Sequence, residues 1–353
     1  MVKILLCLSL ILAAGCSSSH DYIYGTANGS VSIVEWKDGK LKEIQKLETG
    51  VSGAICYSPK HGTLYVVSGR ATKDGSPNGR ILTLDENGKV ALKGKFNFPH
   101  GYTYIALDYT GDYLIAASYG TGHTDVFKLD AEGMPHLKDT VYENKNTAHA
   151  VLISPDNKYV YIPYVKQHNS LHQYSFDAQT GKMKALDPPK AEVHPTAGPR
   201  HLVRHPSKPF VYSSNEQAVG VSVWSSNENG TLTFKQICPA NDTIAGPGLS
   251  ASSIVITPDG KYVFSAQRGK DPKKNFIHSY EVLSDGKVKP IGKTPCDHIP
   301  WIMQLTSDGS HLLVSASTGG TLTAFEIQTN GSLAEKAKNK WGAGFRHMIV
   351  IDR

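Results

Sequence analysis

Residues 254–286, which read IVITPDGKYVFSAQRGKDPKKNFIHSYEVLSDG, hold one copy of the pattern that decides the fold. A short apolar run, Ile254–Thr257, is followed by a polar Pro-Asp-Gly-Lys turn and a second run, Tyr262–Gln267. Phe276–Leu283 then alternates apolar and polar residues and ends before Asp285-Gly286. Such alternation is typical of half-buried strands, and Asp-Gly supplies the positive φ angles of a tight hairpin turn. The segment therefore predicts consecutive antiparallel strands.

This pattern recurs seven times along the chain. The turn glycines after the alternating strands are roughly 45 to 56 residues apart, a spacing that fits one four-stranded blade of a β-propeller. The alternating strands, each given with its turn glycine, are Val31–Trp36 (Gly39), Arg80–Asp85 (Gly88), Thr124–Asp130 (Gly133), Leu171–Asp177 (Gly181), Val221–Ser226 (Gly230), Phe276–Leu283 (Gly286) and Thr321–Gln328 (Gly331).

The first unit lacks an innermost strand before Tyr22–Thr26, and the C-terminal Met348–Asp352 has a pattern that can fill this place. Pairing the two termini would remove an exposed strand edge. We therefore predict an all-β fold over residues 21–353: a single seven-bladed β-propeller of four-stranded antiparallel blades, closed by pairing of the N- and C-terminal strands. The innermost strands of the other units are predicted at Ala54–Tyr57, Tyr104–Tyr109, Ala150–Ser154, Leu202–His205, Ile254–Thr257 and Ile302–Thr306.

Composition excludes several classes of protein. The chain has 353 residues, of which 40% are hydrophobic and 19% are charged. Apolar residues are spread evenly, which excludes intrinsic disorder, and the single long apolar run excludes a polytopic membrane protein. The formal net charge is +6, and no basic run with interleaved aromatic residues occurs. We therefore predict no nucleic-acid partner.

The N-terminus has the features of an export signal. Lys3 precedes the apolar run Ile4–Ala14, which is too short for a comfortable membrane span. The run ends in Leu-Ala-Ala-Gly before Cys16, which resembles a bacterial lipobox, where the cysteine thiol receives a diacylglycerol. We expect a lipoprotein signal peptide at residues 1–15, a lipidated linker at 16–20, and a cell-envelope lipoprotein that faces the periplasm or sits in the outer membrane. An ordinary cleaved signal or a short uncleaved anchor is the alternative.

The remaining cysteines and the known motifs give no evidence of a metal site. Cys56, Cys238 and Cys296 are widely spaced, and none lies in a Cys-x-x-Cys motif. We therefore predict neither a disulfide framework nor a zinc site, and expect buried thiols. No His-Glu-x-x-His, phosphate-loop or Gly-x-Ser-x-Gly pattern occurs. We predict no metal and no cofactor.

The predicted strand order places the candidate chemistry on one face of the ring. Loops that enter the innermost strands share this face with loops that leave the second strands, and both sets are rich in cations and imidazoles. Such a cluster predicts a funnel that concentrates anions, and a solvated polar rim is the alternative. The residues are His100, His149, Arg200, His201, His298, Arg346 and His347 from the entering loops, and Arg70, His123, Lys166, His168, Asn215, Glu216 and Arg268 from the leaving loops.

Four of these residues have side chains suited to catalysis. His149 is the best-placed candidate for acid–base chemistry, because imidazole titrates near neutral pH. Glu216 could orient His149, or activate water itself if burial raises its pKa. Arg200 and Arg268 could bind a phosphate or carboxylate and stabilise an oxyanion.

Several segments resemble the seven-bladed β-propeller lactonase family, which includes one type of bacterial 6-phosphogluconolactonase and the fungal carboxymuconate cyclases. The segment Gly-Pro-Arg-His-x-Val-x-His-Pro, followed one hairpin later by Asn-Glu, is the most specific part of the resemblance. The matching segments are 148–158, 162–167, 198–206, 214–216 and 256–262.

The resemblance implies hydrolysis of a small anionic sugar lactone, similar to 6-phosphogluconolactone, without a metal. It places the catalytic residues at His149, Glu216, Arg200 and Arg268. One departure is Pro300-Trp301, where the family often has Pro-Arg before an inner strand. The residues that we expect to bind substrate are His201, Asn215, Lys166 and His298.

The sequence is also compatible with a second hypothesis. The chain could be a non-enzymatic envelope β-propeller that binds a sugar, a cell-wall fragment or a protein, since a fold does not by itself specify a reaction. In either case we expect a monomer that contacts the membrane through the lipid at Cys16.

Overall fold

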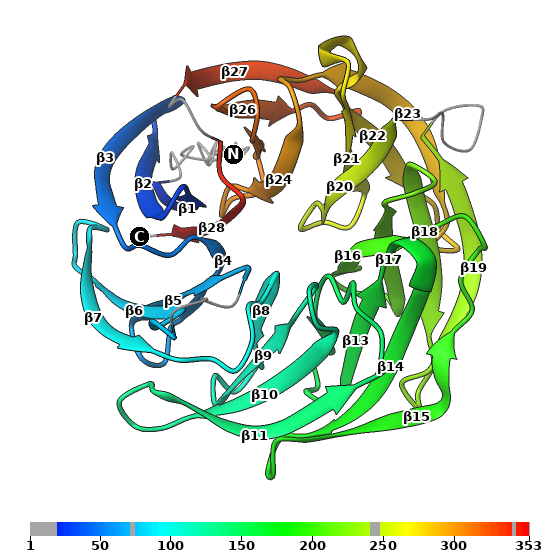
Figure 1. Cartoon of the computed structure of the whole chain (residues 1–353). Coiled ribbons are helices and arrows are strands. Elements are labelled where there is room, and N and C mark those ends of the chain that lie inside the picture. The colour runs from blue at the N-terminus through cyan, green and yellow to red at the C-terminus, as the bar shows by residue number, and fades with distance from the viewer. Residues whose placement is uncertain (1–19, 71–74, 241–247, 341–343, 353) are drawn as a thin grey trace, which may run out of the picture.

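The computed structural model describes residues 20–70, 75–240, 248–340 and 344–352, whose strands form seven four-stranded antiparallel sheets around a ring (Figure 1). The predicted seven-bladed β-propeller is therefore confirmed. The described residues contain the short 3-10 turns η1 (Lys166–His168) and η2 (Pro272–Lys274), and none of their helices is long and apolar enough to cross a membrane. Cys16 and the predicted signal peptide lie outside the described residues.

In each blade the strands follow one another outward from the central axis in chain order, except that the C-terminal β28 is the innermost strand of blade 1. From the innermost strand outward, blades 1 to 4 are β28 (His347–Asp352), β1 (Asp21–Ala27), β2 (Ser30–Lys37), β3 (Lys40–Glu48); β4 (Gly53–Ser58), β5 (Thr63–Ser68), β6 (Gly79–Leu84), β7 (Val90–Phe96); β8 (Tyr104–Leu107), β9 (Tyr113–Ala117), β10 (His123–Leu129), β11 (Pro135–Tyr142); and β12 (Leu152–Ile153), β13 (Tyr159–Tyr164), β14 (Ser170–Asp177), β15 (Lys182–Ala191). Blades 5 to 7 are β16 (Pro199–Arg204), β17 (Phe210–Asn215), β18 (Gly220–Ser226), β19 (Leu232–Pro239); β20 (Leu249–Ile256), β21 (Tyr262–Gly269), β22 (Phe276–Val282), β23 (Val288–Pro295); and β24 (Pro300–Leu305), β25 (His311–Ala316), β26 (Thr321–Ile327), β27 (Leu333–Lys340).

The predicted turn glycines also connect neighbouring blades. All seven have positive φ angles, between 70° and 82°, as tight hairpin turns require. The hydroxyl of Tyr65 in blade 2 donates to the carbonyl of Gly133 in blade 3 over 2.6 Å. Tyr161 in blade 4 makes the same bond to Gly230 in blade 5 over 2.7 Å. The repeat in the sequence is therefore also a repeat of contacts between blades.

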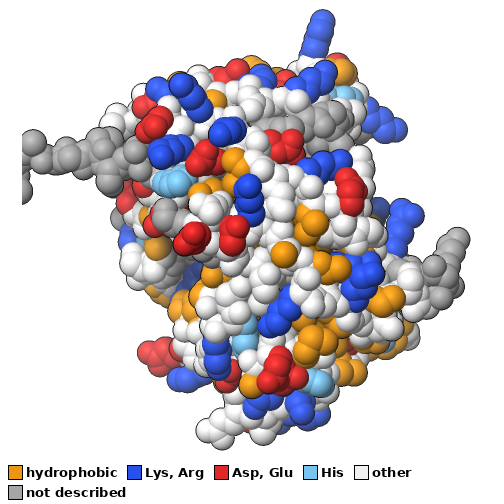
Figure 2. Space-filling view, turned by 90° about the vertical axis from the view of Figure 1, so that its left-hand side faces the viewer, with side chains coloured by type: hydrophobic (Ala, Val, Ile, Leu, Met, Phe, Trp, Pro, Cys, Tyr) orange, Lys and Arg blue, Asp and Glu red, His pale blue; other side chains and the backbone are white. Residues whose placement is uncertain are grey.

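The hydrophobic core lies between the blades. In the described part of the chain it forms seven clusters, and each cluster joins two neighbouring blades. The outermost strands are polar instead; β3, for example, reads KLKEIQKLE. Figure 2, a view onto the rim of the ring, shows Lys and Arg interspersed with Asp and Glu. Charged edge strands oppose edge-to-edge association of copies.

The two ends of the chain close the ring, as predicted. β28 pairs with β1 in antiparallel register from Thr26–His347 to Asp21–Asp352. Gly25 makes this closure possible, because a Cβ built there would lie 2.2 Å from Cγ of the buried Phe345 ring. The closing segment is thus held by backbone pairing and by one close ring-to-backbone contact.

The innermost strands are irregular at the end nearest the mouth, just before the segments that were predicted as inner strands. The pairing register shifts between Pro199 and Leu202 in β16, and similar shifts occur in β20 and β24. In blade 4 the predicted strand Ala150–Ser154 is reduced to β12, preceded by an isolated bridge at Ala148. β-Bulges redirect side chains, and these irregular stretches are where the mouth residues lie.

Candidate active site

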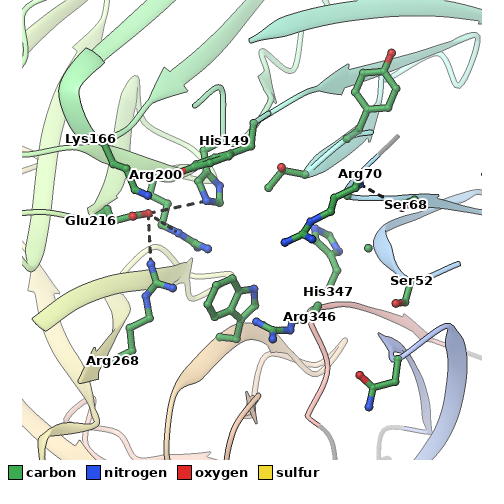
Figure 3. A pocket seen from close by; sticks show the side chains of 17 residues that line it. Ser52, Ser68, Arg70, His149, Lys166, Arg200, Glu216, Arg268, Arg346 and His347 are labelled. Carbon is green, nitrogen blue, oxygen red and sulfur yellow. Dashed lines mark hydrogen bonds and ion pairs between the residues drawn. The ribbon is translucent and has the colours of Figure 1, made fainter. Parts of the chain in front are cut away.

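A pocket of about 630 Å³ opens at one mouth of the ring, and each blade contributes to its wall. Among the described residues, the lining includes five cations and a single carboxylate, so this part of the wall carries a net positive charge. This agrees with the predicted face and its predicted charge. Figure 3 shows the main side chains pointing into the opening. The charged lining residues are Arg70, Lys166, Arg200, Glu216, Arg268 and Arg346.

Glu216 is the point where the catalytic candidates meet. Its Oε2 accepts a hydrogen bond from Nε of Arg200 at 3.1 Å and lies 3.4 Å from a terminal nitrogen of Arg268. The same oxygen lies 4.0 Å from Nε2 of His149. The Glu216 backbone is fixed as well, since its N–H donates to Gly198 over 2.7 Å. The four predicted catalytic residues are thus brought together around one carboxylate.

Arg200 is a fully buried cation held by several blades. A terminal nitrogen donates to the Ser252 carbonyl in blade 6 over 2.7 Å, and the Ser252 hydroxyl donates to the Pro300 carbonyl in blade 7. Burial and the neighbouring Arg268 guanidinium lower the pKa of Arg200 to about 9, so it remains charged at neutral pH. This chain of bonds fixes the guanidinium relative to three blades.

His149 is buried and electrically neutral at neutral pH. Its side chain is 7% exposed, and its backbone N–H donates to Pro163 over 2.9 Å. Burial, followed by the nearby charges of Arg200 and Arg268, lowers the pKa of His149 well below 6.5. A neutral imidazole has one unprotonated nitrogen that can accept a proton, so His149 is already in the form of a general base.

His201 lies behind Arg200 and has a defined tautomer. Its Nε2 is 3.1 Å from a terminal nitrogen of Arg200. A guanidinium only donates, so Nε2 must accept and the proton of His201 must be on Nδ1. The ring also packs edge-on against His149, with 5.3 Å between ring centroids. His201 therefore supports Arg200 and His149 from below and does not itself line the pocket.

Trp301 occupies the centre of the positive wall. The guanidinium carbons of Arg268, Arg346 and Arg200 lie 4.5, 4.8 and 5.2 Å from its ring centroid. Cations over an indole face are stabilised by the ring quadrupole. The position that departs from the family pattern thus keeps three cations close together instead of supplying one.

The other predicted substrate-binding residues are not all in the pocket. Lys166 lines it, with Nζ 5.4 Å from the Tyr119 ring centroid. Asn215 is buried at the end of β17, where Oδ1 accepts from the Ser213 hydroxyl. His298 lies outside the pocket, and its Nε2 is 3.2 Å from the Lys270 carbonyl.

Sequence reasoning assigned no role to Tyr119, whose ring lines the pocket and packs edge-on against His149 at 5.6 Å. The available signal was its position: Tyr119 follows the second strand of its blade, as Glu216 and Lys166 do in theirs. Two mouth candidates, His100 and His123, stack on each other at 4.0 Å and do not line the pocket.

The described residues contain no group of three or more His, Cys, Asp or Glu side chains placed to hold a metal ion. Cys56 and Cys238 are buried and Cys296 is partly buried, and all three thiols are free. The reactive groups in the described lining of the pocket include imidazoles, a carboxylate and guanidiniums.

The known proteins that resemble this chain include several lactonases. The family described as "Lactonase, 7-bladed beta-propeller" matches residues 16–345. The 6-phosphogluconolactonases of Cronobacter sakazakii and Klebsiella pneumoniae (strain 342) are 30% and 29% identical over 339 residues, 93% of this chain and 97% and 98% of those proteins. The structure of the Pseudomonas aeruginosa periplasmic gluconolactonase superposes with a TM-score of 0.80 and 18% identity, covering 95% of this chain and 99% of that one. That likeness shows the shared fold.

Proposed function

The chain belongs to the seven-bladed β-propeller lactonase family, and on that premise we propose that it hydrolyses a small anionic sugar lactone, similar to 6-phosphogluconolactone. The observation that carries this proposal is the position of Arg200, Arg268 and His149 within 4.0 Å of Glu216, the one carboxylate in the described lining of a cationic pocket. It combines a neutral base with positive charge, which is what ester hydrolysis requires.

The proposed reaction begins with attack of water on the lactone carbonyl carbon. His149 takes a proton from the attacking water, while Glu216, 4.0 Å from Nε2 of His149, accepts a hydrogen bond from the same water. The spacing exceeds that of a direct hydrogen bond and leaves room for a water that contacts both groups. The oxygen of this water becomes part of the product carboxylate.

Collapse of the tetrahedral intermediate completes the hydrolysis. The bond between the former carbonyl carbon and the ring oxygen breaks, and the ring oxygen receives the proton held on His149. Arg200 and Arg268 supply positive charge while the carbonyl oxygen is negative. The product is a hydroxy acid, whose carboxyl group releases one proton at neutral pH. Lactones also open spontaneously, so the required lowering of the barrier is modest for an enzyme.

The charge of the pocket supports an anionic substrate. In the described lining, five cations face one carboxylate, and their summed field concentrates anions at the mouth. The non-enzymatic hypothesis would use the same field for binding alone, and an assay separates the two.

The test is hydrolysis of 6-phosphogluconolactone and gluconolactone by residues 17–353, followed by proton release and corrected for spontaneous opening. We expect catalysis by the wild type and a loss of about 100-fold or more in kcat/KM in His149→Gln and Arg200→Gln. Arg204→Gln is the matched control, because Arg204 lines a separate pocket. Ligand binding without any catalysed hydrolysis would favour the non-enzymatic hypothesis.

We further propose that the protein is a monomer in the cell envelope, anchored by a lipid on Cys16. The lipobox-like sequence supports the anchor, and a pocket lined by all seven blades of one chain supports the monomer. Cys16→Ser should move the protein from the membrane fraction to the soluble envelope fraction and abolish palmitate labelling. Light scattering of residues 17–353 tests the monomer.

A further inference from the structure

The pocket has a second positive wall that the proposed hydrolysis does not use. Arg70, after β5, and Arg346, before β28, project into the opening from the side opposite Glu216 (Figure 3). Neither guanidinium takes part in an ion pair within the described part of the chain. Arg200 and Arg268, by contrast, share the charge of Glu216.

Two serine hydroxyls on this wall have a proton left to donate. The Ser52 oxygen accepts from the backbone N–H of Gly29 at 2.9 Å, and the Ser68 oxygen accepts from that of Arg70 at 3.2 Å. Among the described residues, neither hydroxyl has an acceptor for its own proton. Two hydroxyl donors and two cations that have no ion pair among the described residues therefore line the same pocket.

The backbone that carries this wall is held in place. A Cβ built at Gly101 would lie 2.3 Å from Cα of Arg70, so that loop packs directly on the entry to blade 3. Tyr102 also donates its backbone N–H to Ser68 over 2.8 Å. On the other side, the backbone N–H of Arg346 donates to Thr26 over 2.8 Å. The wall is thus preorganised by backbone contacts of two blades.

Trp301 brings the two walls within electrostatic range of each other. Arg346 and Arg268 lie against its ring at 4.8 and 4.5 Å. The Arg346 charge contributes, after burial, to lowering the pKa of Arg268. This repulsion is relieved when an anion occupies the space that Arg346 faces.

We propose that Arg70, Arg346, Ser52 and Ser68 form a second anion subsite, which binds a phosphate monoester on the substrate, remote from the lactone carbonyl. The subsite deepens the proposed function and rests on it. Two guanidiniums and two hydroxyls supply the number of donors and the positive charge that the three terminal oxygens of a phosphate dianion require, whereas a single carboxylate is already satisfied by one guanidinium fork. Arg346 thereby supplies a cation beside Trp301, the position at which the family often has arginine.

The decisive comparison is the substrate preference, defined as kcat/KM for 6-phosphogluconolactone divided by kcat/KM for gluconolactone. Arg346→Gln should lower this ratio about tenfold or more, because it removes charge-assisted hydrogen bonds to the phosphate alone. Ser68→Ala, a smaller change that keeps the charge, should lower it in the same direction. Arg204→Gln, which removes one charge elsewhere, should leave the ratio unchanged. An unchanged ratio in Arg346→Gln, or an equal loss on both substrates, would overturn the subsite.

Binding of the products separates this proposal from the proposed function. In titration calorimetry, 6-phosphogluconate should bind the wild type more tightly than gluconate does, and Arg346→Gln should remove most of this difference. These affinities need no turnover, so they test the subsite even if the wild type hydrolyses neither lactone. Equal affinities of the wild type for the two acids would overturn it.

Discussion

Nε of Arg200 donates to Oε2 of Glu216 over 3.1 Å, and this bond joins the innermost strand of blade 5 to the loop after its second strand. Blade 5 therefore carries a preformed ion pair, to which blade 6 adds Arg268 and blade 4 adds His149. Arg200 is nearly inaccessible and Glu216 is 12% exposed, so each of these charges depends on the other in a poorly solvated place.

Glu216→Gln should impair both stability and activity. The substitution keeps the shape of the side chain but leaves Arg200 and Arg268 without their shared counter-charge. Breaking a buried ion pair in this way costs about 3 kcal/mol in the free energy of unfolding, measured by urea denaturation. The value of kcat/KM should fall about 100-fold. Glu228→Gln, at an exposed position, is the control, and equal behaviour of the two variants would contradict the assigned role.

The activity should persist in mild acid. The pKa of His149 is lowered well below 6.5, so the neutral base is lost only when the pH falls well below that value. We expect kcat/KM to stay constant from pH 7.5 through pH 6.5 and to decline at lower pH, after subtraction of spontaneous opening. An inflection at or above pH 6.5 would show that His149 is not the base or is not buried as described.

Acid should destabilise the fold through the buried imidazole of His347. Burial, followed by the charge of Arg200, lowers the pKa of His347 to about 4. The unfolded chain takes up this proton near pH 6.5 and the folded chain only near pH 4, so the free energy of unfolding falls across this window, by about 3 kcal/mol. His347→Phe should reduce the slope of stability against pH. A slope equal to that of the wild type would contradict this assignment.

Ring closure should be sensitive to one methyl group. In Gly25→Ala the new methyl carbon would lie 2.2 Å from Cγ of Phe345, which is too close for a van der Waals contact. The substitution should therefore lower the free energy of unfolding by about 1–3 kcal/mol. Gly94→Ala is the matched control, because a Cβ at Gly94, also within a strand, would meet no atom within 4 Å. Urea denaturation of the two variants gives the comparison. Equal stability of the two variants would mean that Phe345 moves aside freely.

The fold and the composition of the mouth could be predicted from sequence because both depend on repeated local signals. Turn glycines such as Gly39 and Gly331 mark every blade, and strand order then determines which loops share a face. Strand order alone places the loops of His149, Glu216 and Arg268 on the same face. The face of a loop follows from strand order and does not depend on how far each side chain lies from the central axis.

Radial position and local backbone turns were the parts that could not be predicted. His298 lies just before the innermost strand β24, and Arg200 lies at the start of β16. Ile299, however, has a φ of 63°, a conformation rare for a β-branched residue. His298 lies outside the pocket. The convergence of three guanidiniums on Trp301 is equally invisible in the sequence, because it depends on side chains from blades 1, 5 and 6.

Arg346 directly precedes β28, the strand that closes the ring, so ligand binding at the mouth is coupled to ring closure. A ligand that binds both Arg346 and Arg200 would link the terminal strand β28 to blade 5 on the other side of the pocket. At a concentration one hundred times its Kd, such a ligand adds about 2.7 kcal/mol to the free energy of unfolding. Binding of the ligand would then raise the melting temperature, and a substitution that weakens the pairing of β28 with β1 would lower the affinity for the ligand.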